Sequence, residues 1–180
     1  KIFENTEENV VLKGDIFDSM KNIAVDFAYL DPPYGSNNEK MPPSRVRYAS
    51  YYHVWATICK NDKPPVFGAA LRREDTSDRV AATVFEEFRK DNDGHFIAVK
   101  AIEKLIQNVN AKYVALSYSS GGKATAEELN DILNRHGKLI KTIELDYKKN
   151  VMADMKWTNE WLRDAEEPNR EFIFLIDKQA

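Results

Sequence analysis

The sequence predicts an α/β layered fold with a mostly parallel sheet. Short apolar runs, which are typical of strands, alternate with longer segments in which apolar residues recur at helical spacing. Two of these runs, residues 24–30 and 112–118, are largely apolar, which predicts strands buried on both faces. No long helix separates the last two predicted strands, residues 138–148 and 170–178. We therefore expect a hairpin that places one antiparallel strand in the sheet.

The other predicted elements complete this alternation. Residues 10–13 predict a short strand that ends in a Gly-Asp turn. The predicted helices span residues 16–22, 45–61, 79–90, 96–109 and 124–135. Asp78 is expected to cap the third of these helices, and Gly137 is expected to end the last one. A polar loop is expected over residues 35–43, after the strand of residues 24–30.

The composition is that of a soluble globular chain that forms one domain. The chain has 180 residues, of which 43% are hydrophobic and 31% are charged, and this length is enough to bury a core. No apolar stretch is long enough to span a membrane, and residues 1–10 lack the apolar region of a signal peptide. The single cysteine, Cys59, excludes an internal disulfide and suits a reducing cytoplasm. Because Cys59 lies on the apolar face of a predicted helix, we expect it in the core.

The net charge of −3 neither indicates nor excludes a nucleic-acid partner. Basic residues cluster within residues 40–47 and again within residues 60–73. On charge alone, a solvated surface is the favoured interpretation of such clusters. His95 and His136 are isolated in the sequence, so no metal site is predicted.

The predicted strand of residues 24–30 ends in Asp31, Pro32, Pro33 and Tyr34. In open α/β sheets, ligands bind beyond the carboxyl ends of the strands. The two prolines have no N–H groups and a fixed φ, so this backbone presents rigid carbonyl acceptors. Asp31 adds a charged acceptor and Tyr34 a flat aromatic face. The combination suits a planar ligand with an amino group at its edge, and the alternative is a strand-ending turn in which Asp31 is a local cap.

Several segments together resemble one family. DPPY at residues 31–34 is similar to motif IV of S-adenosylmethionine-dependent amino-methyltransferases, and GDIFD at residues 14–18 resembles their acidic segment for the cofactor's adenine. Residues 48–64 resemble the segment that follows DPPY in the Dam-like N6-adenine DNA methyltransferases. The apolar runs ending at residues 120 and 178 are similar to later strands of that family. The resemblance covers nearly all of the chain. Together these motifs are specific for the family, whereas DPPY is the only one that is specific when taken singly.

The resemblance implies a Rossmann-like methyltransferase sheet and a methyl transfer from S-adenosylmethionine. The acceptor would be the exocyclic N6 of an adenine flipped out of specific double-stranded DNA. It also implies an enzyme of a restriction–modification system that acts on the nucleoid in the bacterial cytoplasm. An RNA or cytosine-N4 amino-methyltransferase is a second interpretation, because these enzymes share the motif chemistry. A non-catalytic nucleic-acid-binding module that lost the cofactor site is a third.

The resemblance further implies roles for individual residues. Catalysis would involve Asp31, Pro32, Pro33 and Tyr34, and Asp31 would also face the cofactor. Asp15 would accept a hydrogen bond from the cofactor's adenine amine, with Ile16 or Phe17 beside the ring, although Asp15 suits a helix N-cap equally well. The candidates for substrate binding are Tyr51, Tyr52, His53, Ser117, Ser119, Arg72 and Arg73. Helix packing, strand-end hydrogen bonding and a solvated surface are the competing explanations for these residues.

The chain departs from the family pattern in its cofactor-binding half. It lacks the glycine-rich Phe-x-Gly-x-Gly motif and the acidic residue expected on the next strand to hold the ribose. No separate target-recognition region is evident. We therefore expect residues 1–180 to form a single catalytic portion, the C-terminal part of a longer methyltransferase whose N-terminal segment is its partner. The isolated chain is expected to bind S-adenosylmethionine weakly or not at all.

Overall fold

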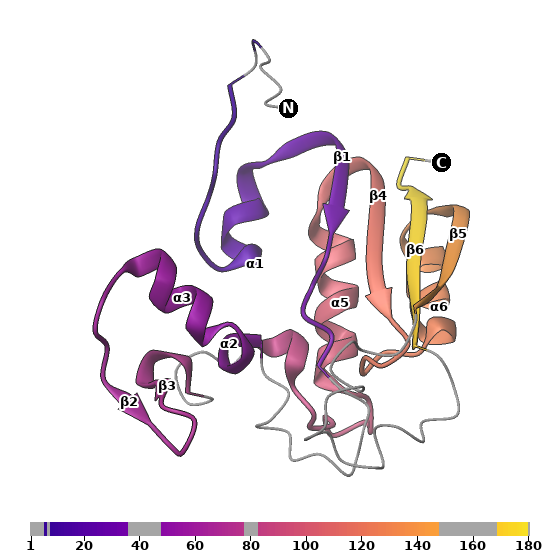
Figure 1. Cartoon of the computed structure of the whole chain (residues 1–180). Helices are drawn as coiled ribbons and strands as arrows, with labels where there is room; N and C mark the ends of the chain where they lie inside the picture. Colours follow the sequence, from indigo (N-terminus) through magenta and orange to yellow (C-terminus); the bar gives the residue numbers. More distant parts are fainter. Residues whose placement is uncertain (1–5, 7, 36–47, 78–82, 148–168, 180) are drawn as a thin grey trace.

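The structure, a computed structural model of the whole chain, describes residues 6, 8–35, 48–77, 83–147 and 169–179. Its main feature is a four-stranded sheet with the strands in the order β1 (Ala24–Leu30), β4 (Asn110–Ser119), β6 (Asn169–Asp177) and β5 (Lys138–Tyr147). β1 pairs with β4 in parallel, whereas β6 lies antiparallel to both β4 and β5. The predicted α/β class, the hairpin and the antiparallel strand near the C-terminus are confirmed (Figure 1).

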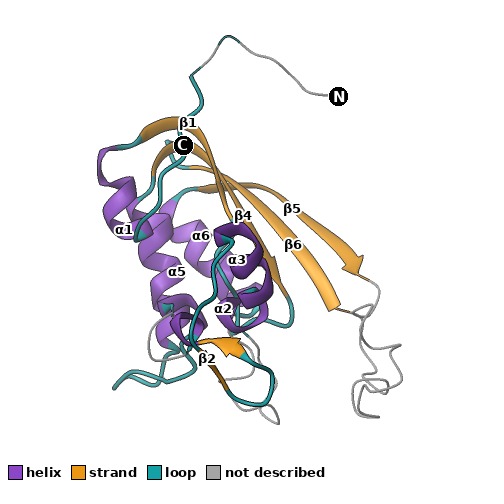
Figure 2. Ribbon diagram, turned by 60° about the vertical axis from the view of Figure 1, so that its left-hand side comes forward, coloured by secondary structure: helices purple, strands orange, loops and turns teal. Residues whose placement is uncertain are grey.

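Two amphipathic helices cover one face of this sheet. α5 (Ile97–Asn108) and α6 (Ala126–His136) lie on the same side of it (Figure 2). The largest fully buried side chains between helices and sheet are Ile102, Ile106, Val114, Leu116, Tyr118, Leu129, Leu133, Phe174 and Ile176. Thr125 caps α6 in a capping box with Glu128, and the Lys178 ammonium donates to carbonyl oxygens at the end of α5. Both helices confirm the sequence prediction.

Gly137 follows α6 as predicted, but its conformation is not that of a left-handed helix cap. Its φ is 173°, which is extended backbone. A Cβ atom at this position would lie 2.6 Å from the carbonyl oxygen of Asp177 in β6. Glycine is therefore needed here for the close approach of two backbones rather than for a left-handed turn.

The opposite face of the sheet carries no helix among the described residues (Figure 2). Strand alternation and register place an exposed apolar set on it, namely Val25, Phe27, Tyr29, Ile143 and Leu145. We call the side of the sheet that carries this set the open face. The prediction that residues 24–30 are buried on both faces is wrong, because β1 lies at the edge of the described sheet and only Ala28 and Leu30 in it are partly buried.

The segment before β1 differs in part from the prediction. Residues 8–13 form no regular structure, and Val11 is 95% exposed. The strand predicted at residues 10–13 is wrong, because none of the described strands lies beside it to supply ladder hydrogen bonds. α1 (Ile16–Ser19) and the 3-10 helix η1 (Met20–Asn22) confirm the predicted helix, and buried Met20 joins it to the core.

A smaller unit of two helices and a hairpin lies to one side of the sheet (Figure 1). α2 (Tyr48–Tyr51) and α3 (His53–Lys60) divide the single helix predicted over residues 45–61. The antiparallel pair β2 (Val66–Phe67) and β3 (Arg72–Arg73) has no counterpart in the prediction. Cys59 on α3 is exposed, so its predicted core position is wrong.

The region between this unit and α5 shows the largest local difference. In the described part of the predicted helix of residues 79–90, only the 3-10 turn η4 (Val84–Glu86) is helical. Phe85 and Glu86 are buried there, so tertiary contacts override helical spacing. A second 3-10 turn, η3 (Glu74–Thr76), follows β3.

Some predicted features lie outside the described residues. They are Asp78, the polar loop beyond Gly35 and the connection between β5 and β6, residues 148–168. Among the helices that the structure describes, none is long and apolar enough to cross a membrane.

Candidate functional site

The turn after β1 carries Asp31, Pro32, Pro33 and Tyr34 at the carboxyl end of the two parallel strands. Asp31 is exposed and Pro32 is buried. Gly35 ends the turn with a φ of 57°, a left-handed conformation that a side chain would strain. Two prolines and a glycine therefore fix the path of the backbone that presents the acid to solvent.

The carbonyl oxygen of Tyr34 joins this turn to the turn after β4. It accepts hydrogen bonds from the Lys123 N–H at 3.1 Å and from the Tyr118 hydroxyl at 3.4 Å. The Tyr118 hydroxyl also accepts a hydrogen bond from the Ala124 N–H at 3.2 Å. Because the two prolines have no N–H groups, groups from the exit of β4 hold the turn in place.

Four tyrosines, Tyr118, Tyr34, Tyr48 and Tyr52, form a row of contacting rings beside the turn, which we call the aromatic row. Tyr34 meets Tyr118 and Tyr48 edge to face, with ring centroids 5.5 and 5.8 Å apart. Tyr48 stacks on Tyr52 at 5.9 Å. The Tyr48 N–H donates to the buried Glu86 carboxylate at 2.7 Å, which fastens α2 to the site. The row provides a partly exposed aromatic surface next to Asp31.

Burial controls the protonation of three members of the aromatic row, Tyr118, Tyr34 and Tyr48. It raises the pKa of the Tyr118 hydroxyl to about 12. Burial also raises the pKa of Tyr34; a hydrogen bond with Tyr48 acts in the opposite direction, and the charges of Glu171 and Asp31 add to the rise. Burial raises the pKa of Tyr48 as well, and its hydrogen bond with Tyr34 adds to this rise. These hydroxyl groups are therefore protonated at neutral pH and serve as hydrogen-bonding groups rather than as bases.

The end of β4 brings two serines and an acid to the same edge of the sheet. Buried Ser119 pairs directly across the ladder with Glu171 of β6. Ser117 pairs with Ile173, and strand alternation places Ser117, Ser119 and Glu171 on the open face. The two serines predicted as site residues thus lie at the same end of the sheet as Asp31.

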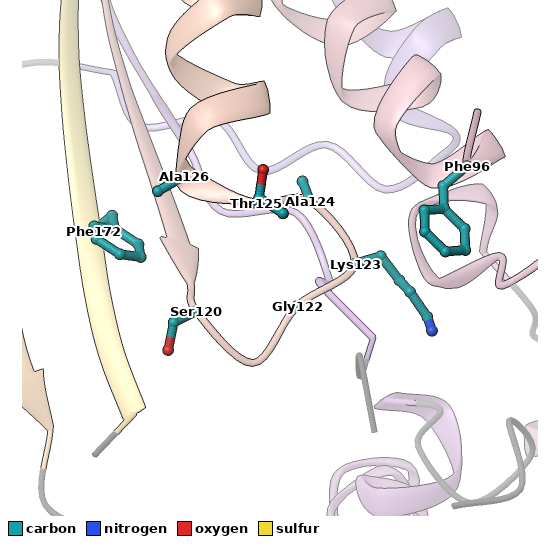
Figure 3. Close-up of a pocket in the computed structure, with 8 residues that line it drawn as sticks. All are labelled: Phe96, Ser120, Gly122, Lys123, Ala124, Thr125, Ala126 and Phe172. Atoms are coloured by element: carbon teal, nitrogen blue, oxygen red, sulfur yellow. The ribbon is translucent and has the colours of Figure 1, made fainter. Parts of the chain in front are cut away.

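A cleft of about 340 Å³ adjoins this edge on the helix-covered side of the sheet (Figure 3). Phe172, the start of α6 and the turn after β4 line it, and the Lys123 ammonium lies 5.3 Å from the centroid of the Phe96 ring. A Cβ atom on Gly122 would lie 2.5 Å from the Tyr118 ring, so the turn can approach this ring only with glycine. Lys123 therefore both lines the cleft and holds the turn after β1 through its N–H. Tyr118 holds the same turn through its hydroxyl and lies against Gly122 in the cleft wall.

Asp15 occupies the N-cap position of α1. Its carboxylate accepts a hydrogen bond from the Phe17 N–H at 2.8 Å, as the capping alternative predicts. Asp15 and Ile16 remain exposed. The Phe17 ring is engaged in packing instead, since it stacks on Phe85 at 5.8 Å.

The segment of α2 and α3 supplies one of its predicted contact residues to the aromatic row. This residue is Tyr52, which is exposed at the outer end of the row. His53 begins α3, where its carbonyl oxygen accepts a hydrogen bond from the Thr57 hydroxyl at 3.0 Å. The side chain of Tyr51 lies outside the described part of the structure.

Arg73 is the centre of an ion-pair cluster, which argues against its predicted contact with phosphate. Its side chain is 3% exposed and donates to both carboxylate oxygens of Asp62 and of Asp75. These hydrogen bonds raise the pKa of Arg73 and lower the pKa of Asp75 below its usual range. Arg72 has its guanidinium carbon 4.9 Å from the centroid of the Phe67 ring and is partly exposed. The phosphate-contact hypothesis is therefore confined to Arg72.

Sequence reasoning does not identify Tyr48, Tyr118 and Glu171 as part of the site. Tyr48 lies at helical spacing and Tyr118 at strand spacing, so each is interpreted as core. An acid within an otherwise apolar strand is the signal that marks Glu171. The described residues contain no group of three or more His, Cys, Asp or Glu side chains that could hold a metal ion.

Comparison with known proteins finds type II modification methylases. Modification methylase StsI of Streptococcus sanguinis is 27% identical over 132 residues, which are 73% of this chain and 17% of the relative. Type II methyltransferase M.FokI of Planomicrobium okeanokoites is 27% identical over 177 residues, 98% of this chain and 24% of the relative. Type II methyltransferase M2.HphI of Haemophilus parahaemolyticus is 23% identical over 184 residues, 99% of this chain and 42% of the relative.

These relatives confirm the resemblance that the motifs predict, because the chain is a homologue of several type II modification methylases. The chain spans less than half the length of each of the three relatives. No family model matches the chain, and no solved structure matches it.

The hydroxyl of Tyr118 yields a test of how the site is held. Tyr118→Phe removes the hydroxyl and leaves the Ala124 N–H and the Tyr34 carbonyl without this partner. We expect the free energy of unfolding, measured with denaturant, to fall by about 1–3 kcal/mol. Tyr29→Phe on exposed β1 is the matched control and should change it by less than about 0.5 kcal/mol. Equal effects of the two substitutions would contradict the bridging role of Tyr118.

Proposed function

We propose that this chain carries the methyl-acceptor site of an S-adenosylmethionine-dependent DNA methyltransferase that is specific for adenine N6. One observation carries the proposal. A rigid turn at the carboxyl end of a parallel strand presents the exposed Asp31 carboxylate beside the aromatic row, in a homologue of type II modification methylases. Beyond the carboxyl ends of the strands is where open α/β sheets bind ligands.

Asp31 and the prolines would bind the amino group of the target base. The nitrogen lone pair of such an amine is delocalised into the ring, which makes it a poor nucleophile. Hydrogen bonds from the amine to Asp31 and to the carbonyl oxygen of Pro32 draw its hydrogens away from the ring and favour a tetrahedral nitrogen. The chain then acts by positioning and electrostatics, without a covalent intermediate.

Tyr34 and its neighbours would hold the flipped base. Flipping costs a few kcal/mol, and stacking on an aromatic ring returns about 1–3 kcal/mol per base. The edge-to-face contacts with Tyr118 and Tyr48 fix the Tyr34 ring, so little rotamer freedom remains to be lost on binding. Exposed Tyr52 extends the surface that a base can contact.

The described residues fit only part of the proposed cofactor. Exposed Asp15 retains acceptor capacity for the adenine amine, and exposed Ile16 offers an apolar contact beside it. Phe17 does not fit this role, because its ring packs on Phe85. When bound, S-adenosylmethionine would supply an electrophilic methyl group.

The unit formed by α2, α3 and the β2–β3 hairpin would contact the DNA backbone. Arg72 is its candidate phosphate contact, and the buried ion pairs of Arg73 hold the hairpin against α3. We further propose that the substrate is double-stranded DNA and that the enzyme protects it in a bacterial restriction–modification system. Such an enzyme works on the nucleoid in the cytoplasm.

We also propose that an N-terminal segment of the same protein completes the sheet. β1 is an edge strand whose exposed side chains include Phe27, at 54%, and Tyr29, at 56%. Parallel strands are normally covered on both faces, and an exposed apolar edge is a pairing surface. The homologues are longer than this chain, so they contain polypeptide for such a role. An added strand beside β1, with helices over the open face, would cover these side chains and supply the rest of the cofactor site.

Replacement of Asp31 tests the proposed reaction. Asp31→Ala should lower methyl transfer to DNA at least about 10²-fold, because it removes a charged acceptor for the amine. The fold should survive, since Asp31 is exposed and contributes no core volume. The measurement is incorporation of labelled methyl groups by the methylating protein that carries this chain. Asp26→Asn, at an exposed acid on the strand that precedes Asp31, is the matched control, and normal methylation by Asp31→Ala would overturn the motif interpretation.

Phe27→Asp tests the completion of the sheet. In the isolated chain this substitution should change the free energy of unfolding little, because Phe27 is exposed. In the longer protein it should weaken S-adenosylmethionine binding, measured by titration calorimetry, since it places a charge in the proposed contact. The isolated chain should bind the cofactor weakly or not at all. Tight binding by the isolated chain would contradict the proposal.

A further inference from the structure

None of the residue roles proposed so far involves the Glu171 carboxyl group. The fold nevertheless places this group at the end of the sheet where the proposed reaction would occur. It lies near the start of β6, opposite Ser119 of β4 and Leu145 of β5. Leu116 of β4 pairs with Leu30, the last residue of β1, so Ser119 comes three residues beyond that level. At a rise of about 3.3 Å per residue, Ser119 and Glu171 lie about 10 Å past the end of β1, beside the turn that carries Asp31.

An acid at this position is unfavourable for the fold. Glu171 is partly buried, and Ile173 and Leu145 beside it on the open face are apolar. Burial raises the pKa of Glu171 and the charge of Asp31 raises it further, although a hydrogen bond with Ser119 acts in the opposite direction. The adjacent Arg170 is engaged elsewhere, 2.7 Å from Glu144 on β5. A partly buried carboxyl group with a raised pKa that lies beside a candidate site is a candidate for function.

We propose that Glu171 is the proton acceptor of this site, linked through the Ser119 hydroxyl to the amine that Asp31 binds. The inference rests on the proposed methyl transfer. In that reaction a nitrogen–carbon bond forms to the methyl group while the carbon–sulfur bond of the sulfonium donor breaks, and the electron pair stays on sulfur. The amine nitrogen is then positively charged and must lose one proton. Glu171 takes up this proton and later releases it to water.

The surroundings of Glu171 suit this task. A base is most effective when its pKa approaches the working pH, so a carboxylate with a raised pKa accepts a proton more readily than an ordinary one. Among the residues that the structure describes, those that face it are Ser119, Leu145, Tyr34 and Asp31, and none of these is cationic. The negative charges of Glu171 and Asp31 also stabilise the positive charge that develops on the amine.

The test compares Glu171→Gln with the control Glu144→Gln in the methylating protein that carries this chain. Single-turnover methylation of DNA is measured as a function of pH. Glu171→Gln should slow the reaction about 10²-fold and remove the fall in rate at acid pH that protonation of Glu171 causes. Glu144→Gln changes an exposed acid on the neighbouring strand and should leave the rate and the pH profile unchanged. Glu171→Asp keeps a carboxyl group and should recover part of the rate.

The thermal stability of the 180-residue chain provides a second readout. Because the pKa of Glu171 is raised in the folded state, its ionisation opposes folding at neutral pH, and protonation removes this cost. Glu171→Gln should therefore raise the unfolding temperature at neutral pH, and the gain should vanish below about pH 4. A residue with a purely structural role would instead lower the unfolding temperature when replaced.

The outcomes separate this inference from the proposed function. Wild-type protein that transfers no methyl group would reject the proposed function, and the role of Glu171 with it. Active wild-type protein with an equally active Glu171→Gln variant, including the same fall at acid pH, would reject only the role of Glu171. A Gln variant that is less stable than wild type at neutral pH would also reject that role.

Discussion

The candidate site depends on the hydrogen bonds to one carbonyl oxygen, that of Tyr34. Pro32 and Pro33 remove two backbone N–H donors from the turn after β1, which leaves fewer donors to hold the turn in place. The Lys123 N–H and the Tyr118 hydroxyl, both from the exit of β4, supply donors in their place. The same contacts set the position of Asp31, the orientation of the Tyr34 ring and one wall of the cleft. A rigid acceptor site thus results from the pairing of two neighbouring strand exits rather than from the DPPY sequence alone.

The uneven covering of the sheet connects stability with the proposed chemistry. α5 and α6 bury one face and supply most of the apolar core, whereas the open face and the β1 edge remain exposed. Asp31, Ser117, Ser119 and Glu171 lie at the carboxyl end of that exposed side. A partner that covers the open face would therefore also enclose the polar groups at its end, lower the local dielectric constant and strengthen their interactions.

Sequence reasoning identified the elements whose signals are local. The C-terminal end of β1 follows from the two prolines, and α6 follows from its capping residue and its apolar spacing. Long-range contacts account for the differences. Residues 83–90 have helical spacing, but burial of Phe85 and Glu86 decides their conformation, and the apolar residues at 10–13 lack a strand to pair with. For the same reason the role of Arg73 could not be predicted, since Asp62 and Asp75 become its partners only when the hairpin packs on α3.

Mapping the methylated base would test the proposed specificity for the N6 of adenine. The longer protein that is proposed to contain this chain would be incubated with labelled S-adenosylmethionine and a library of random double-stranded DNA, and the modified positions would be sequenced. We expect label on the N6 of adenine within one recurring sequence, because we propose that Asp31, Pro32 and Tyr34 bind a planar base with an exocyclic amine. Label on another base or another atom, or no label at all from protein that binds the cofactor, would contradict it.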